Sequence, residues 1–124
     1  MKRFVNQWCV YNVDLGEPNG SVQGGVRPCL IVQNAIGNSY SPTTVCVPIT
    51  HQQNKSNIPP HYTLYKSEYP FFNYNTNVLL CEQIVTIDVH NQVLQYMGKI
   101  KDNDKEPILN TINKNFILKD ERSK

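Results

Sequence analysis

Apolar and polar positions along this chain follow the short period and clustering typical of β-strands. Segments rich in aromatic and β-branched residues at 8–15, 28–33 and 43–49 are separated by turns rich in glycine, proline and asparagine. Further strands are predicted at 61–64, at 77–87, which is the longest, and at 93–100. Five or six short strands joined by turns favour a small antiparallel β-barrel.

The segment 28–33 is a continuous apolar run, as expected for a strand buried on both faces. A polar turn is predicted at 34–42 and a polar loop at 52–60. Proline is disfavoured in a central strand, so we expect the strand at 43–49 to end or bulge at Pro48. Thr50 is then expected at a strand terminus, at the lip of the sheet.

A helix is predicted near the end of the chain. Asp104 can cap it, and Pro107 is tolerated in a first turn because the donor that proline lacks is unpaired there anyway. Apolar residues at helical spacing are expected to face the barrel, namely Ile108, Leu109, Ile112 and Phe116. We expect a single domain at 1–118 and a frayed, charged tail at 119–124.

Composition supports a folded, cytoplasmic domain. The chain has 124 residues, 40% hydrophobic and 18% charged, which is a globular balance rather than that of a disordered segment. The start lacks the apolar core of a signal peptide, and no apolar run approaches the ~20 residues that a bilayer demands. We therefore expect no membrane partner.

The net charge of +2 implies that any contact with nucleic acid is local, because no broad basic surface is available. Arg27, Lys55 and Lys66 are the only cations in residues 15–98, so a cation in the middle of the chain stands out. The cysteines form no C-x-x-C pair and lie in apolar runs, which favours buried structural thiols over zinc or disulfides; they are Cys9, Cys29, Cys46 and Cys81.

Residues 23–28, Gln-Gly-Gly-Val-Arg-Pro, contain the strongest candidate chemistry. A guanidinium held beside glycine backbone suits a phosphate, because it is always charged and donates two parallel hydrogen bonds. The alternative for Arg27 is a surface arginine after a flexible loop. The Thr50 hydroxyl can contact a phosphate oxygen or satisfy a local turn.

The chain resembles the MazF/PemK toxin family through several motifs in matching order. These are residues 23–28, Ile31-Val32-Gln33-Asn34, Ile36-Gly37-Asn38, Ser41-Pro42-Thr43, Pro48-Ile49-Thr50, and Glu82-Gln83-Ile84 with Thr86-Ile87-Asp88. The resemblance runs from about Trp8 to the final helix. It implies a mainly β fold with a C-terminal helix, the small SH3-like antiparallel barrel of the CcdB, MazF and Kid toxins.

The resemblance also implies an mRNA interferase, a sequence-specific endoribonuclease that cuts single-stranded RNA and so inhibits translation and growth. Arg27 and Thr50 take the catalytic roles, with no cofactor or metal, and the RNA's own 2′-hydroxyl attacks the phosphorus. The products are a 2′,3′-cyclic phosphate and a 5′-hydroxyl. The implied partners are a second copy in a homodimer and a cognate antitoxin, with DNA bound only indirectly through the toxin–antitoxin complex.

Base recognition is expected from the loop before Arg27 and from the Glu-Gln pair, that is, from Leu15, Asn19, Ser21, Gln23, Gly24, Gly25, Glu82 and Gln83. His51 is an accessory candidate, since an arginine is a poor base and histidine is the usual proton carrier. The aromatic residues of 65–74, among them Phe71, Phe72 and Tyr74, either stack on bases or pack over the barrel.

Two other functions compete with RNA cleavage. One is a gyrase-poisoning toxin of the CcdB type, and the other is a non-catalytic barrel that binds RNA or protein. The pairing of Arg27 with Thr50 argues against the first. Cleavage of RNA by the purified protein separates all of these functions.

Overall fold

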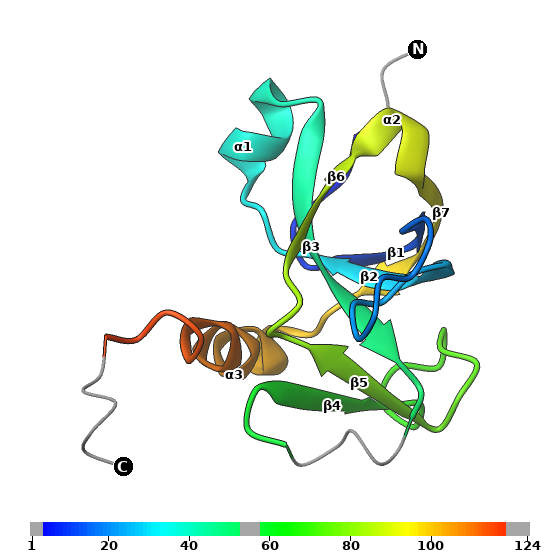
Figure 1. Ribbon diagram of the computed structural model, residues 1–124. Coiled ribbons are helices and arrows are strands. Elements are labelled where there is room, and N and C mark those ends of the chain that lie inside the picture. Colours follow the sequence, from blue (N-terminus) through cyan, green and yellow to red (C-terminus); the bar gives the residue numbers. More distant parts are fainter. Residues whose placement is uncertain (1–3, 53–57, 119–124) are drawn as a thin grey trace.

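The strands of this protein form one curved antiparallel sheet. The computed structural model describes residues 4–52 and 58–118 (Figure 1). The strands are β1 (Cys9–Asp14), β2 (Val26–Ile31), β3 (Thr43–Thr50), β4 (His61–Tyr65), β5 (Thr76–Leu80), β6 (Val85–Asp88) and β7 (Val93–Lys99). They pair in the order β4-β5-β3-β2-β1-β7, with β6 also on β3, and within the described ranges this path does not close on itself. The predicted mainly β, barrel-like fold with a C-terminal helix is confirmed.

Strand β3 connects the two halves of the sheet. Along one edge its residues 43–46 pair with β6, and Ile49 and Thr50 pair with β5. The predicted end or bulge at Pro48 was wrong, because β3 continues to Thr50. Pro48 falls between the β6 and β5 ladders, where a residue without an N–H costs no bond to either strand. Thr50 is the last residue of the strand, as predicted.

The central strands are buried on both faces, as the apolar run at 28–33 predicted. Leu30 of β2 belongs to one hydrophobic cluster, whereas Cys29 and Ile31 belong to a second cluster on the opposite face. The first cluster lies beneath the C-terminal helix and also contains Tyr69 and Phe72. Alternate side chains of the same strand therefore fill two separate cores.

Several predicted boundaries differ from the structure. Residues 34–42 contain a short helix, α1 (Ala35–Tyr40), because the Asn34 side chain caps it by accepting from Gly37 N–H. The strand predicted at 77–87 is two strands, β5 and β6, separated by a turn, and the unpredicted helix α2 (Val89–Gln92) follows them. Most of the predicted loop at 52–60 and all of the predicted tail at 119–124 lie outside the described residues.

Helix α3 (Asp102–Asn113) begins earlier than predicted. Its N-cap is Lys101, so Pro107 lies in the helix interior. Asp104 is not the cap. It lies within the first turn of the helix, and its side chain is buried. The carboxylate accepts a hydrogen bond from the Tyr62 hydroxyl at 2.6 Å and another from the Tyr69 hydroxyl. Ile108 and Ile112 face the core as predicted, but Leu109 and Phe116 are exposed.

Burial changes the ionisation of the phenols and thiols. It raises the pKa of Tyr62 and of Tyr69, and the hydrogen bond of each to Asp104 raises it further. The folded state thus holds neutral phenols, a contribution to stability that is complete below pH about 10 and is lost as the pH rises further. All four cysteines are free and buried, which confirms the structural thiols, and burial raises the pKa of Cys81 to about 12. None of the helices in the described ranges is long and apolar enough to span a bilayer.

We predict that Asp104→Ala destabilises the fold by about 1–3 kcal/mol, because it leaves two tyrosine hydroxyls without their acceptor. The matched control is Asp102→Ala on the same helix, where the exposed carboxylate forms a surface pair with Lys105 and its removal should destabilise the fold much less. Urea unfolding followed by circular dichroism measures both. Equal destabilisation by the two variants would show that the Asp104 network carries no stability.

Candidate active site

Arg27 and Thr50 line one cavity of about 290 Å³. The cavity lies where the start of β2 meets the end of β3, and β1, β7 and the connection between β4 and β5 complete its wall. The other residues that matter for its chemistry are Asn12, His51, Tyr74 and Asn77. The structure therefore brings together the cation and the hydroxyl that the sequence analysis paired.

Strand register explains why these residues meet. Strands β2 and β3 are antiparallel, with Cys29 opposite Pro48. Continued by two residues, this register sets Arg27 across from Thr50, the separation at which cross-strand side chains interact. The paired ladder itself ends at Cys29 and Pro48, and the residues beyond it on both strands line the cavity.

The Arg27 guanidinium is oriented but not neutralised. Its Nε donates to the Gly24 carbonyl oxygen at 3.0 Å, which fixes the direction of the side chain. The salt bridges found in the described part of the chain join other residues, and no carboxylate there pairs with Arg27. The terminal nitrogens of the guanidinium are thus left to bind an anion.

The Thr50 hydroxyl is nearly buried, with 4% of the residue exposed. Its Oγ1 accepts a long hydrogen bond from Gln52 N–H at 3.4 Å. This bond uses the oxygen as acceptor and leaves the hydroxyl proton to donate to a ligand in the cavity. The predicted local-turn role and the predicted phosphate contact are therefore compatible.

The glycines before Arg27 shape the loop that orients it. A Cβ on Gly24 would lie 2.3 Å from the Pro18 nitrogen, so only glycine fits this close approach. Gly25 has φ +75°, and its N–H donates to the Gly16 carbonyl at 2.6 Å. The two halves of the loop are thereby closed on each other, and the Gly24 carbonyl is directed at Arg27.

The predicted base-binding residues divide into groups. Ser21, Gln23 and Gly24 line a second cavity of about 300 Å³ that also includes Arg27. Leu15, Gln23 and Gln83 line a smaller one of about 110 Å³. Asn19, Gly25 and Glu82 are not among the residues lining these cavities or the cavity of Arg27 and Thr50.

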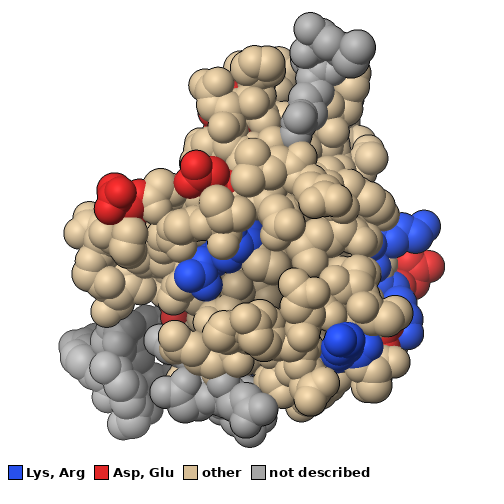
Figure 2. Space-filling view, turned by 90° about the vertical axis from the view of Figure 1, so that its right-hand side faces the viewer, with Lys and Arg blue, Asp and Glu red and all other residues tan. Residues whose placement is uncertain are grey.

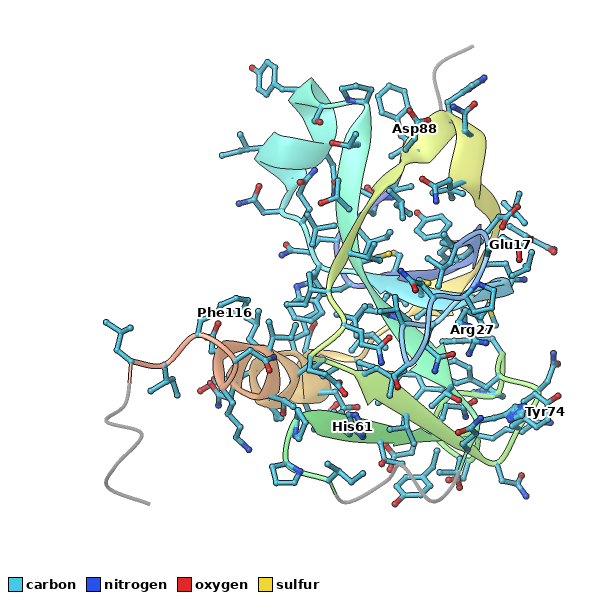
Figure 3. The ribbon with its side chains drawn as sticks, in the orientation of Figure 1. Glu17, Arg27, His61, Tyr74, Asp88 and Phe116 are labelled. Atoms are coloured by element: carbon cyan, nitrogen blue, oxygen red, sulfur yellow. The ribbon has the colours of Figure 1, made fainter. Side chains whose placement is uncertain are left out.

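The Glu82-Gln83 pair has structural partners. The Gln83 amide accepts from Gln23 N–H at 3.0 Å and donates to the Ser21 carbonyl at 3.1 Å, which ties the turn between β5 and β6 to the loop. Glu82 pairs with His61 at 2.9 Å. His61 lies away from the side of the molecule on which Arg27 and Tyr74 are found (Figure 3).

Two contacts at the cavity were not foreseen from the sequence. The His51 ring stacks on Tyr74 with a centroid separation of 3.9 Å, and the Asn12 amide borders the same cavity. Tyr74 was named as an aromatic candidate, but no sequence signal joined it to His51, because their contact depends on the path of the chain between β4 and β5. Of the other aromatic candidates, Phe72 is buried and Phe71 packs against the core, as the packing alternative predicted.

The charge around the site is sparse. Figure 2 shows the right-hand face of Figure 1, where basic side chains occur singly or in small groups and form no broad patch. This agrees with the local contact expected from a net charge of +2. In residues 4–52 and 58–118 no cluster of three or more histidine, cysteine, aspartate or glutamate side chains is placed to hold a metal ion.

Comparison with known proteins gives concordant matches. The family model of the PemK-like, MazF-like toxin of type II toxin-antitoxin systems matches residues 6–116. Endoribonuclease MazF of Staphylococcus saprophyticus subsp. saprophyticus is 40% identical over 103 residues, which is 83% of each chain.

Solved structures share the fold at lower identity. A mycobacterial endoribonuclease in complex with its cognate antitoxin matches with a TM-score of 0.74 at 23% identity, over 93% of this chain and 97% of that chain. MazF (Form-I) from Deinococcus radiodurans matches with a TM-score of 0.74 at 15% identity, over 92% and 97%.

Proposed function

Because this chain belongs to the PemK-like, MazF-like toxins of type II toxin-antitoxin systems, we propose that Arg27 and Thr50 are the catalytic pair with which it cuts single-stranded RNA. The observation that carries the proposal is the shared cavity, which is lined by a guanidinium that pairs with no carboxylate among the described residues and by a hydroxyl with a proton to donate. The 40% sequence identity between this chain and an endoribonuclease, over most of the length of both, supports the same reaction.

The chemistry requires little from the enzyme beyond charge stabilisation. The 2′-hydroxyl of RNA loses its proton as its oxygen attacks the adjacent phosphorus, and the bond to the 5′-oxygen breaks. The 5′-oxygen takes up a proton, so the products are a 2′,3′-cyclic phosphate and a 5′-hydroxyl. Arg27 neutralises the extra negative charge of the pentavalent intermediate, and Thr50 donates to a non-bridging oxygen. One such donor typically contributes ~2.7–4 kcal/mol in acyl-transfer sites, and a comparable term is expected here.

The loop before Arg27 is proposed to select the RNA sequence. Ser21, Gln23 and Gly24 share a cavity with Arg27, so a strand whose phosphate binds Arg27 passes over their polar groups. Gln83 acts by holding this loop, because both ends of its amide are bonded to the loop backbone. Recognition of unstacked bases by such groups is usual for single-stranded RNA.

The proposed partners follow from the relatives. A cognate antitoxin accompanies the mycobacterial endoribonuclease, and a MazE–MazF complex is known from Deinococcus radiodurans. We expect this toxin to be held inactive by its own antitoxin, to form a homodimer, and to contact DNA only through that complex. Exposed apolar side chains after α3, Phe116, Ile117 and Leu118, offer a surface for such partners. Messenger RNA as substrate implies the cytoplasm.

We predict that the purified protein cuts single-stranded RNA in the presence of EDTA and leaves 2′,3′-cyclic phosphate and 5′-hydroxyl ends. A 2′-deoxy substitution at the scissile nucleotide abolishes the cut, because the attacking oxygen is gone, and the same substitution elsewhere in the strand does not. Denaturing gels with end-group labelling measure this. Intact RNA, or cleavage that survives the 2′-deoxy substitution at the scissile nucleotide, would contradict the proposed reaction.

We predict that Arg27→Ala lowers kcat by about 10²–10³-fold with little change in Tm, since the side chain is half-exposed and lies near the start of strand β2. Thr50→Val should also lower kcat. The controls are Lys66→Ala, an exposed cation, and Thr86→Val, an exposed strand threonine, which leave activity unchanged. A loss of folding in Arg27→Ala equal to its loss of activity would mark Arg27 as structural.

A further inference from the structure

The cavity of Arg27 and Thr50 has an aromatic wall that the cleavage reaction does not use. His51 directly follows Thr50, and its ring contacts Tyr74 at a centroid separation of 3.9 Å and an interplanar angle of 41°. Both residues are exposed, Tyr74 at 54%, and both line the cavity. Figure 3 shows Tyr74 on the same side of the molecule as Arg27.

Hydrogen bonds from a buried side chain fix the position of Tyr74 in this wall. The Asn77 side chain, which is buried, donates to the Tyr74 carbonyl oxygen at 2.8 Å. A second, longer bond from the same amide reaches the Leu64 carbonyl on β4. The backbone of Tyr74 is therefore held to the sheet, while its ring stands in solvent against His51. Aromatic surface that is exposed to water is unfavourable, and a ligand that covers the two rings removes that surface from water. Because the rings are already held in place, little conformational entropy is lost when the ligand binds.

The ligand chemistry follows from the neighbouring groups. An exposed pair of aromatic rings in the same cavity as a phosphate-binding cation matches a nucleotide, because the base of a bound strand lies beside its own phosphate and stacks on aromatic faces. The Asn12 amide lines the same cavity, and in the described part of the chain its side chain makes no hydrogen bond. It can offer a donor and an acceptor to a base edge.

We propose that His51 and Tyr74 form a stacking platform for the nucleobase adjoining the scissile phosphate, with the Asn12 amide facing the edge of that base. This subsite rests on the proposed function, since it assumes a phosphate at Arg27 and Thr50. This cavity and the cavity of Ser21 and Gln23 share Arg27 and are otherwise lined by different residues, so a strand whose phosphate binds Arg27 has two separate sites for its bases.

The competing role for His51 is proton transfer during cleavage. The geometry favours stacking, because the ring lies against Tyr74 and no carboxylate among the described residues is hydrogen-bonded to it to set its tautomer. The two roles differ in what they require: stacking needs an aromatic ring at position 51, whereas proton transfer needs a titratable one.

An abasic scan tests the platform by binding alone. The probe is a single-stranded RNA that carries the mapped cleavage site, blocked by 2′-deoxy at the scissile nucleotide, with one base removed at a time. We expect wild-type affinity to fall about 5- to 100-fold at one position beside the cut. Tyr74→Ala should bind the intact strand more weakly by a similar factor and should no longer respond at that position.

The matched control is Tyr65→Ala, which removes a ring of similar exposure, 52%, that does not line the cavity. It should behave as wild type in the scan. A Tyr74→Ala variant that responds to every missing base as wild type does would overturn the platform, even if its Tm were lowered. Should Tyr74→Ala fail to fold, the same scan with His51→Ala decides the question by the same criterion.

Kinetics with His51→Phe separate stacking from proton transfer. We expect His51→Phe to retain the wild-type KM, kcat and pH profile, because the ring is kept, and His51→Ala to raise KM with kcat nearly unchanged. A loss of kcat and of one limb of the pH profile in His51→Phe would overturn the stacking role. The proposed function fails independently of this, through an Arg27→Ala variant that still cleaves RNA at the wild-type rate.

Discussion

The antiparallel register between β2 and β3 is the constraint on which the site depends. It sets Cys29 against Pro48, and the same register continued by two residues beyond the ladder brings Arg27 across from Thr50. A slip of one residue would turn one of these side chains to the other face of the sheet. Slippage is prevented because β3 is also paired with β6 and β5, and because both faces of β2 and β3 fill separate cores. The packing of the whole domain thus fixes the distance between a cation and a hydroxyl.

Around Arg27 and Thr50 the site is built mainly from backbone contacts and contains few charged side chains. Gly24 closes the loop against Pro18 and turns its carbonyl to Arg27, while Gln83 fastens the same loop to the turn between β5 and β6. No carboxylate in the described ranges pairs with Arg27, so the terminal nitrogens of its guanidinium are left to bind a phosphate. A toxin of net charge +2 is therefore proposed to act on RNA through the single guanidinium of Arg27, with the polar and aromatic groups that line the two cavities around it selecting the strand.

Much of this could be predicted from the sequence, where local signals agreed with the fold. The β-strand pattern, the buried run at 28–33, the buried cysteines and the terminal position of Thr50 were all predictable. Predictions failed where contacts between residues distant in sequence determine the local structure. Pro48 continues β3 because it falls between two ladders, and Asp104 is buried because Tyr62 and Tyr69 approach it from distant parts of the chain. The contact of His51 with Tyr74 has the same origin, since residues so far apart in sequence are joined only by the folded sheet.

The most direct test of the account is a crystal structure of the protein with a single-stranded RNA blocked by 2′-deoxy at the scissile nucleotide. The account predicts that the scissile phosphate lies in the cavity between β2 and β3, with non-bridging oxygens accepting hydrogen bonds from the Arg27 guanidinium and the Thr50 hydroxyl. A scissile phosphate bound elsewhere, with neither residue in contact with it, would contradict the account.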